Sequence, residues 1–322
     1  MMFRVSVVIP TCRRPDRLDA CLAALVSQRL DRSAYEVIVV DDADHGATRR
    51  LVEDRADRPG PAIRYLAVAG RHGPASARNL GWRRASAEVI AFTDDDCLPG
   101  PGWLAAGLAA MEGGAVAATG RVVVPLPESP TDYERDAAGL EGAEFVTANL
   151  FCRRDTIEAV GGFDERFAVA WREDSDLHFA LIGTGGRIVG APDAVVVHPV
   201  RPAPWGVSLR QQRKSLFDAL LYKKHPTLYR RRVRSGPPWA YYAIVASTVA
   251  AALGAWLGSR PVALAAAGVW AALTARFCLA RLRRTSRAPG HLAEMVATSA
   301  LIPYLSVFWR LYGAWKFRVV FF

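Results

Sequence analysis

Short apolar runs alternate with amphipathic stretches along the first hundred residues of this chain. The run from Val5 to Ile9 is interrupted only by Ser6, and the run from Val37 to Val40 is continuous. Such runs are typical of strands that are buried on both faces of a parallel sheet. Between them, apolar side chains recur three and four residues apart, as one face of a helix requires: Leu18, Cys21, Leu22, Leu25 and Val26.

The same alternation continues beyond the second strand. We expect further strands at Ile63–Val68, Val89–Phe92, Ala115–Val124 and Ala194–Val197, and helices at Gly73–Arg84 and Glu173–Ile182. Residues 125–142 hold three prolines and many charges, which favours a surface loop. Strands that alternate with helices predict an α/β fold with a mostly parallel, doubly wound sheet, and such sheets bind ligands at the carboxyl edge.

The chain changes character near Trp239. Residues 239–259 contain no charged side chain, and residues 261–280 form a second apolar segment. Each is close to the roughly 20 residues that a membrane-spanning helix needs. The segment at about 295–315 contains Pro303, so a span, a re-entrant segment and an interfacial helix all fit it. A buried helical hairpin of a soluble protein is the alternative for the first two segments.

The net charge of +10 is concentrated beside these apolar segments. Such clusters favour anionic phospholipid over nucleic acid, for which the sequence offers no zinc finger or aromatic-rich motif. One cluster precedes the first apolar segment: Arg210, Arg213, Lys214, Lys223, Lys224, Arg230, Arg231, Arg232 and Arg234. Another follows the second: Arg281, Arg283, Arg284 and Arg287. We therefore predict three parts, namely a globular domain over 1–204, a basic helical connector over 205–236 and a membrane region over 237–322.

The compartment follows from the N-terminus and the cysteines. The run from Val5 to Ile9 is too short for the apolar core of a signal peptide, so we expect the globular domain to stay in the cytosol. The five cysteines show no metal-ligand spacing and no Cys-x-x-Cys pair, which is typical of reduced thiols. Cys97, beside the acidic run, fits a reactive thiol or a small apolar residue that fills the core, and the second interpretation is favoured.

Acidic residues mark the predicted carboxyl edge of the sheet. Asp94, Asp95 and Asp96 follow the strand that ends at Phe92 and precede a Pro/Gly-rich turn. Three adjacent carboxylates repel one another, so a fold that holds them together usually needs a cation. Oxygen ligands suit Mg²⁺ or Mn²⁺, which also bind phosphates.

Two further acidic clusters and one histidine fit the same site. Asp41 and Asp42 end the second strand, where they can accept hydrogen bonds from a nucleotide base or ribose, or cap the next helix. Glu173 and Asp174 begin a helix, where a carboxylate can serve as general base toward a hydroxyl. His198 ends a strand and is a candidate metal ligand, although a lone histidine is more often structural.

These motifs together resemble those of family 2 glycosyltransferases over roughly residues 4–215. The matching segments are Val8-Ile9-Pro10-Thr11, Val39-Val40-Asp41-Asp42, Ala77-Arg78-Asn79, Phe92-Thr93-Asp94-Asp95-Asp96, Gly161-Gly162-Phe163-Asp164-Glu165 and Glu173-Asp174-Ser175-Asp176-Leu177. The resemblance implies a GT-A fold, a nucleotide-sugar donor and transfer of a hexose or deoxyhexose with inversion at the anomeric carbon.

The resemblance also implies roles for individual residues. Asp94 and Asp96 match the Asp-x-Asp motif, in which Asp96 holds the metal most directly, and His198 matches a late histidine that completes the metal site. Asp174 matches the catalytic base, with Glu173 beside it. The donor-binding set comprises Pro10, Thr11, Asp41, Asp42, Arg78, Asp94 and Asp95. Arg210 and Arg213 lie near the diphosphate or at the membrane surface.

Two departures from the family pattern limit these inferences. Ala43-Asp44 stands where Gly-Ser commonly follows the acidic pair, which leaves the base preference open. Lys214 replaces the tryptophan of the signature found in polymerising members, which argues against processive synthesis. The sequence thus predicts a membrane-anchored, metal-dependent glycosyltransferase whose acceptor is a lipid-linked or cell-envelope saccharide. A nucleotidyltransferase and a non-catalytic membrane scaffold with the same fold are the alternatives.

Overall fold

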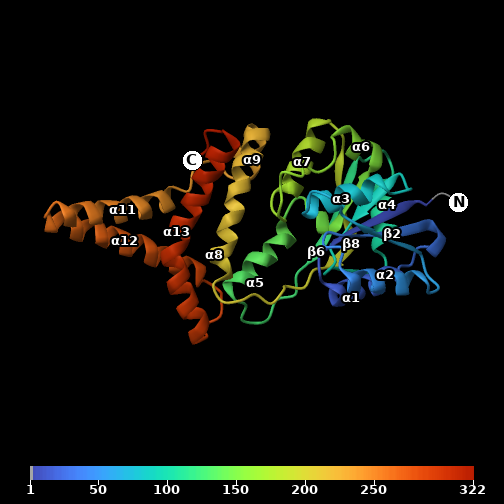
Figure 1. Cartoon of the computed structure of the whole chain (residues 1–322), viewed down its shortest axis with the longest axis horizontal. Coiled ribbons are helices and arrows are strands. Elements are labelled where there is room, and N and C mark those ends of the chain that lie inside the picture. The colour runs from blue at the N-terminus through green and yellow to red at the C-terminus, as the bar shows by residue number, and fades with distance from the viewer. Residues whose placement is uncertain (1–2) are drawn as a thin grey trace. The chain divides into compact units, whose positions relative to one another are not determined.

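The computed structural model describes residues 3–322 and divides the chain into two compact units (Figure 1). The chain up to Pro125 and the segment Ala138–Val200 form the first unit. Leu126–Ala137 and Arg201–Phe322 form the second. The division after residue 200 lies near the predicted boundary at residue 204, but the segment Leu126–Ala137, from the interior of the predicted globular domain, also belongs to the second unit.

An eight-stranded sheet forms the centre of the first unit, in the order β3-β2-β1-β4-β7-β6-β8-β5. The strands are β1 (Val5–Thr11), β2 (Tyr35–Asp41), β3 (Ala62–Ala67), β4 (Val89–Phe92), β5 (Leu98–Pro99), β6 (Ala117–Val123), β7 (Leu150–Arg153) and β8 (Ile188–Val197). β1 pairs parallel with β2 and β4, β2 with β3, and β6 with β8. β7 runs antiparallel to β4 and β6, and β5 to β8. The predicted mostly parallel α/β sheet is confirmed.

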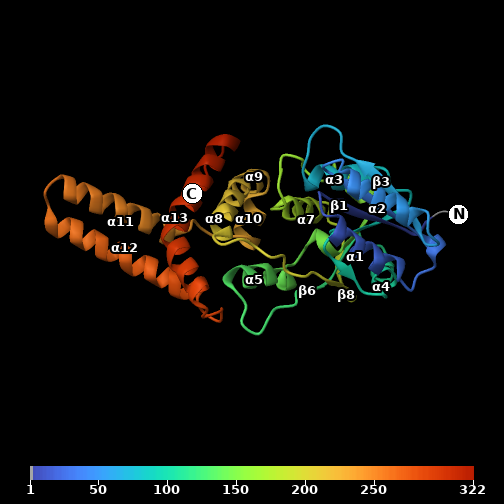
Figure 2. The same ribbon diagram turned by 60° about the horizontal axis from the view of Figure 1, so that its bottom comes forward.

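Helices cover both faces of this sheet. The side chains of a strand alternate between the two faces, and the apolar ones on each face pack against helices. Val7 and Ile9 of β1 join one core with α1 (Pro15–Val26), α2 (Gly46–Ala56) and α4 (Trp103–Met111). Val8 joins a second core with α3 (Pro74–Arg83), α6 (Arg154–Ala159) and α7 (Glu173–Gly183). Figure 2 shows α1 and α4 on one side of the sheet and α3 on the other. The apolar strand runs are therefore buried on both faces, as predicted.

The predicted surface loop over residues 125–142 is wrong, because part of it is helical. It contains α5 (Asp132–Ala137) and the 3₁₀ segment Ala138–Gly142. Thr131 and Glu134 cap α5 reciprocally: the Thr131 backbone N–H donates to Glu134 Oε2 at 2.7 Å, and the Glu134 N–H donates to Thr131 Oγ1 at 3.2 Å. This capping box is a sequence signal for a helix start that outweighs the nearby prolines.

The second unit is helical. Its connector contains α8 (Val207–Gln211), a 3₁₀ turn (Gln212–Ser215), α9 (Leu216–Lys224) and α10 (Pro226–Arg232), followed by α11 (Trp239–Trp256), α12 (Arg260–Arg281) and α13 (Pro289–Phe317). The last three are long and apolar enough to cross a membrane, by length and composition. They differ in burial: 6% of the apolar window of α12 is buried, against 39% for α13.

The arrangement within the second unit explains this difference. α11 and α12 pair as an antiparallel hairpin, and α13 runs across the base of that hairpin in both views (Figures 1 and 2). Ser306 and Gly313 of α13 are buried, and Gly313 lies against Leu216 and Ala219 of α9, on which α13 packs. α13 also exposes large apolar side chains, among them Phe308 and Trp315. α11 and α12 expose Leu253, Trp256, Val262, Leu264, Val269 and Leu279.

Arg281, at the end of α12, joins several parts of the second unit. Its Nη2 lies 2.7 Å from Asp132 Oδ2 on α5, and its Nη1 donates to Thr298 Oγ1 at 2.7 Å and to Ser299 Oγ at 3.0 Å on α13. Arg135 of α5 donates to the carbonyl of Arg283 at 3.0 Å. These contacts explain why α5 belongs to the second unit, although the chain on both sides of it lies in the first.

Candidate active site

The first three parallel strands bring the predicted acidic residues to one edge. Thr11 at the end of β1 is the register partner of Asp41 at the end of β2. Asp94 follows β4, which pairs with the other side of β1. Parallel strands end at the same edge of a sheet, so the two acidic groups open together, as predicted.

The two carboxylates that follow β2 differ in their surroundings. Asp41 is fully buried, and its oxygens accept hydrogen bonds from the N–H groups of Ala43 at 2.9 Å and His45 at 2.7 Å and from the Tyr65 hydroxyl at 3.0 Å. Asp42 Oδ1 accepts a hydrogen bond from the Gly73 N–H at 2.9 Å and lies 3.2 Å from His72 Nδ1, and the Asp42 side chain stays 19% exposed. Within the predicted nucleoside-binding pair, Asp42 is the one that solvent reaches.

Asp95 is an internal member of the acidic run. Its Oδ2 accepts a hydrogen bond from Thr11 Oγ1 at 2.7 Å, and its Oδ1 lies 3.0 Å from Arg14 Nη2. Burial raises the pKa of Asp95 to about 6. Arg14 was not predicted as part of the site, because no pattern near Pro15 marks it. Thr11 and Asp95 stay predicted donor-binding residues, although in the structure they bind each other.

Arg78 connects Asp94 to the acidic pair of α7. Its Nη2 donates to Asp94 Oδ1 at 2.7 Å, and its Nη1 donates to Glu173 Oε1 at 3.1 Å. The arginine is 3% exposed. Its helix α3 approaches β1 closely because Gly81 faces Val8, with which any larger side chain would collide. Arg78 is therefore fixed between the two acidic clusters, and its predicted role in donor binding stays a prediction.

The two acids at the start of α7 occupy different environments. Arg172 precedes them in a left-handed conformation with φ of 73°, which is uncommon for a residue with a side chain and is typical of functional sites. Glu173 is 3% exposed, and burial together with Asp174 raises its pKa to about 7. Asp174 is partly exposed and accepts a hydrogen bond from the Ser175 N–H at 2.6 Å. Burial raises the pKa of Asp174 as well.

The raised pKa of Glu173 predicts how stability depends on pH. Folded Glu173 holds its proton up to a pH of about 7, whereas the unfolded chain releases it near the ordinary value of 4.5. Stability from this group is present below the unfolded pKa and is lost as the pH rises through the folded pKa. We expect the thermal unfolding midpoint to fall between about pH 4.5 and pH 7, and to fall less steeply in Glu173→Gln. Asp95 contributes a smaller fall of the same sign.

The control for this prediction is Glu112→Gln, since Glu112 is exposed. Differential scanning calorimetry across the pH range measures the midpoints. A Glu173→Gln slope as steep as that of the wild type and of the control contradicts the assignment.

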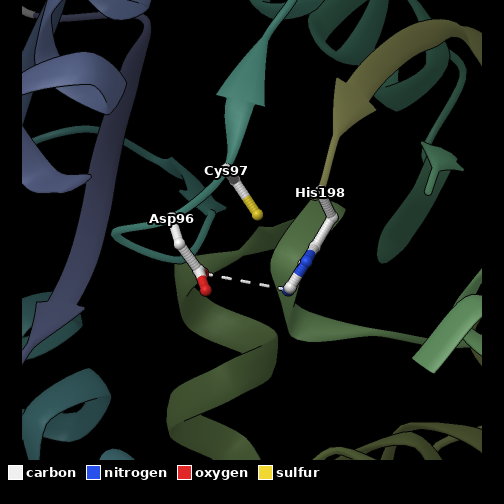
Figure 3. Close-up of side chains that lie close together, drawn as sticks. All are labelled: Asp96, Cys97 and His198. Carbon is white, nitrogen blue, oxygen red and sulfur yellow. Dashed lines mark ion pairs between the residues drawn. The ribbon is translucent and has the colours of Figure 1, made fainter. Parts of the chain in front are cut away.

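A third group gathers around Asp96. The ligand atoms of Asp96, Cys97 and His198 all lie within 4.8 Å of one another, and Figure 3 shows the three side chains converging. His198 Nε2 is 3.8 Å from Asp96 Oδ1, and the two side chains are 13% and 1% exposed. The His198 N–H donates to the carbonyl of Val123 at 2.8 Å, which fixes the histidine at the end of β8.

This group fits a divalent cation by the chemistry of its donors. A buried carboxylate and a neutral imidazole are common ligands of Mn²⁺ and Zn²⁺. The Nδ1 atom of His198 is buried and has no hydrogen-bond partner among residues 3–322. Asp96 and His198 thus meet as predicted, whereas Asp94 is held by Arg78 outside this group. Cys97 is fully buried, but its position among these ligands was not predicted.

Arg210 and Arg213 belong to the second unit. Arg210 lies on α8, and the guanidinium carbon of Arg213 lies 5.8 Å from the centroid of the Trp309 ring on α13. Their predicted role at the diphosphate or the membrane surface stays a prediction.

The sequence is similar to those of known glycosyltransferases. The chain is 30% identical over 220 residues to Glycosyltransferase AglE from Haloferax volcanii, covering 65% of this chain and 70% of that protein. It is 28% identical over 270 residues to Validoxylamine A glucosyltransferase from Streptomyces hygroscopicus subsp. jinggangensis, covering 70% of this chain and 61% of that protein.

Solved structures support the GT-A fold. The mannosyltransferase PcManGT from Pyrobaculum calidifontis, solved with GDP-Man and Mn²⁺, matches with a TM-score of 0.62 at 22% identity and covers 97% of this chain and 88% of its own. The S. aureus TarS fragment 1–349 matches with a TM-score of 0.54 at 15% identity and covers 96% of this chain and 92% of its own.

Family models match both parts of the chain. Residues 135–312 match the family described as Glycosyl transferase family group 2. Residues 6–168, which include the acidic run, Arg78 and the glycine-rich motif at residues 161–165, match the one described as Glycosyl transferase family 2. The chain belongs to glycosyl transferase family 2.

Proposed function

We propose that this protein is a membrane-anchored glycosyltransferase that transfers a hexose or deoxyhexose from a nucleotide-sugar to an acceptor hydroxyl, with inversion at the anomeric carbon. The observation that carries this proposal is the meeting of the acidic clusters at one sheet edge, where Arg78 joins Asp94 to Glu173. The match to a mannosyltransferase solved with GDP-Man and Mn²⁺ supports a nucleotide-sugar donor and a divalent cation.

Asp96 and His198 would hold the cation, Mn²⁺ or Mg²⁺, beside the diphosphate of the donor. A bound divalent cation neutralises charge that develops on the leaving diphosphate. The chain contributes positive charge of its own at this point, because Arg14 Nη1 and Arg17 Nη1 each lie 3.9 Å from Asp96 Oδ2. Asp42, whose carboxylate solvent reaches, contributes to binding of the nucleoside.

Asp174 is the better candidate for the general base. A base must reach the acceptor hydroxyl, and Asp174 is partly exposed, whereas Glu173 is buried and bound to Arg78. We assign Asp174 to remove the hydroxyl proton while the acceptor attacks the anomeric carbon from the face opposite the diphosphate. Glu173 instead holds Arg78 in place.

Both alternatives to a glycosyltransferase are less well supported. A nucleotidyltransferase needs a glycine-rich phosphate loop after its first strand, and Ile9-Pro10-Thr11-Cys12-Arg13-Arg14 has no glycine. A non-catalytic scaffold has no use for buried carboxylates such as Asp95 and Asp96, which are costly to hold together. Hydrolysis of a nucleotide-sugar by the purified protein distinguishes an enzyme from a scaffold.

We propose that α11 and α12 cross the membrane as a hairpin. One basic cluster precedes α11, at residues 230–234, and another follows the apolar part of α12, at residues 281–287. The turn between the two helices carries only Arg260. By the positive-inside rule both clusters face the cytosol, as does the catalytic unit. Because α13 runs across the base of the hairpin and is more buried, we infer that it lies along the membrane interface.

This topology predicts a cytosolic C-terminus. A phosphatase reporter, which is active only outside the cytosol, is expected to stay inactive after Phe322 and to become active in the α11–α12 turn after Gly258. A green fluorescent reporter gives the opposite pattern at the two positions. An active phosphatase after Phe322 would show that α13 crosses the membrane.

We propose that the acceptor is a lipid-linked or cell-envelope saccharide presented at the membrane surface. Each Lys or Arg near an anionic leaflet contributes about 1 kcal/mol of attraction, so the nine basic residues of the connector would hold this region against anionic phospholipid. Anchoring raises the local concentration of a membrane-bound acceptor, whereas a soluble acceptor gains nothing from it.

A screen of donors and acceptors tests the proposed function. Purified protein is incubated with a panel of nucleotide-sugars and Mn²⁺ or Mg²⁺, and transfer of the labelled sugar to membrane-extracted lipid and to aqueous saccharides is compared. We expect one donor to dominate and the label to enter the lipid fraction. Protein carrying Asp96→Asn sets the background. Efficient transfer to aqueous saccharides alone would refute the membrane-bound acceptor, and no turnover of any donor would count against the enzyme.

A further inference from the structure

We propose that the thiolate of Cys97 is a third protein ligand of the cation held by Asp96 and His198. The site would then bind borderline-soft cations such as Co²⁺ and Zn²⁺ in preference to Mg²⁺. The proposal rests on the proposed function only for the location of the metal site. It adds a residue type that the oxygen-rich acidic run did not suggest.

Strand pairing explains why Cys97 and His198 meet. β5 and β8 run antiparallel, with Leu98 opposite Val197 and Pro99 opposite Val196. Continuing this register by one position places Cys97 opposite His198, and side chains of directly opposed residues are neighbours. The Cys97 N–H donates to the carbonyl of Asp94 at 3.1 Å, which fixes the turn from the acidic run into β5. The contact is therefore built into the sheet.

The geometry is close to that of a three-ligand metal site. The carboxylate oxygen, the thiol sulfur and the imidazole nitrogen lie within 4.8 Å of one another. Bonds of about 2.0–2.3 Å to a tetrahedral ion separate such ligand atoms by roughly 3.5 Å, so no pair of these atoms needs to close by more than about 1.3 Å. Three protein ligands leave one coordination position open, which is the arrangement of catalytic rather than structural sites.

The donor set determines which cations are preferred. Sulfur is a soft ligand that Mg²⁺ does not bind, whereas imidazole with thiolate suits Zn²⁺ and Co²⁺. On binding, the cation replaces the thiol proton, which leaves to solvent, and one sulfur–metal bond forms. Cys97 and the Asp96 side chain are buried, so the ligand set is shielded from competing water.

Cobalt spectroscopy tests the proposal without any sugar donor. The full-length protein, stripped with chelator, is titrated with Co²⁺, and the near-ultraviolet charge-transfer band of a cobalt–thiolate bond is recorded together with the visible bands of bound cobalt. We expect the wild type to show the charge-transfer band. In Cys97→Ser we expect it to disappear while the visible bands remain. Zn²⁺ should displace the cobalt, and its affinity should fall roughly tenfold or more in Cys97→Ser.

Other cysteines of the chain provide matched controls. Cys152→Ser alters a thiol that is equally buried but lies on β7, and Cys12→Ser alters an exposed one, so both should keep the band. Cys21→Ser is the most stringent control, because the Cys21 sulfur lies 3.6 Å from the Asp94 carbonyl. Circular dichroism verifies that each variant is folded, and Cys97→Ala provides a second variant if Cys97→Ser is not.

The outcomes separate this inference from the proposed function. Cobalt that binds without a charge-transfer band, a band that survives in Cys97→Ser or Cys97→Ala, or no cobalt binding overturns the inference. Transferase activity can persist in each of these cases. A protein with the band and no transfer to any acceptor supports the ligand and counts against the enzyme.

Discussion

Replacing Asp96 by Asn is expected to remove nearly all sugar transfer. Asp96 is the carboxylate that faces His198, at 3.8 Å, and its side chain is 1% exposed. The amide keeps the shape of the side chain but loses the charge that a divalent cation requires. Without the cation, the negative charge that develops on the departing diphosphate is not neutralised. Such electrostatic stabilisation is usually a large part of the rate acceleration. Initial rates with the preferred donor measure the effect.

Two further measurements make this prediction specific to the metal. Excess chelator should silence the wild type, and added Mn²⁺ should restore it. Asp57→Asn, which alters an exposed aspartate at the end of α2, should leave the rate unchanged. Full activity of the wild type in excess chelator would exclude a role for the metal.

Replacing Asp174 by Asn is expected to lower kcat by about 10²–10⁴-fold, the usual cost of losing a general base. Binding of the donor should change little, because Asp174 bonds to Ser175 on its own helix and is not part of the Arg78 ion pairs. Stopped assays give kcat, and calorimetry with the nucleoside diphosphate gives the affinity.

The comparison with Glu173→Gln distinguishes the two acids. Loss of Glu173 removes a partner of Arg78, so we expect its effect to include weaker donor binding. The two variants should therefore differ in kind: one lowers kcat alone, and the other alters the binding of substrate. A mild Asp174→Asn together with a severe loss of kcat in Glu173→Gln would reverse the assignment.

The sequence predicted the parts of the fold that depend on local pattern. Runs such as Val37–Val40 are continuous because both faces of β2 are covered, so hydrophobicity alone marks the strand. Asp41 and Asp94 follow two parallel strands, which places them at one edge without any knowledge of the loops. The helix at Asp132 is the exception, because the proline- and charge-rich composition of this segment is typical of a loop while its capping box favours a helix.

Contacts between residues far apart in the chain could not be predicted in the same way. Arg78 lies 95 positions before Glu173, and Arg14 pairs with Asp95 through the approach of α1 to the end of β4. Cys97 meets His198 only because β5 and β8 pair, and a two-residue strand leaves almost no pattern in a sequence. The residue types of the site were readable, but their partners follow from the topology of the sheet.

The membership of α5 in the helical unit limits how this protein can be divided. The chain passes from one unit to the other three times, after residues 125, 137 and 200, so no single cut separates them. A fragment that ends at Val200 would keep α5 but lose Arg281, leaving Asp132 without its ion-pair partner. In such a fragment, His198 would lie only two positions from the new C-terminus. A soluble catalytic fragment therefore requires replacement of residues 126–137 as well as removal of the C-terminal helices.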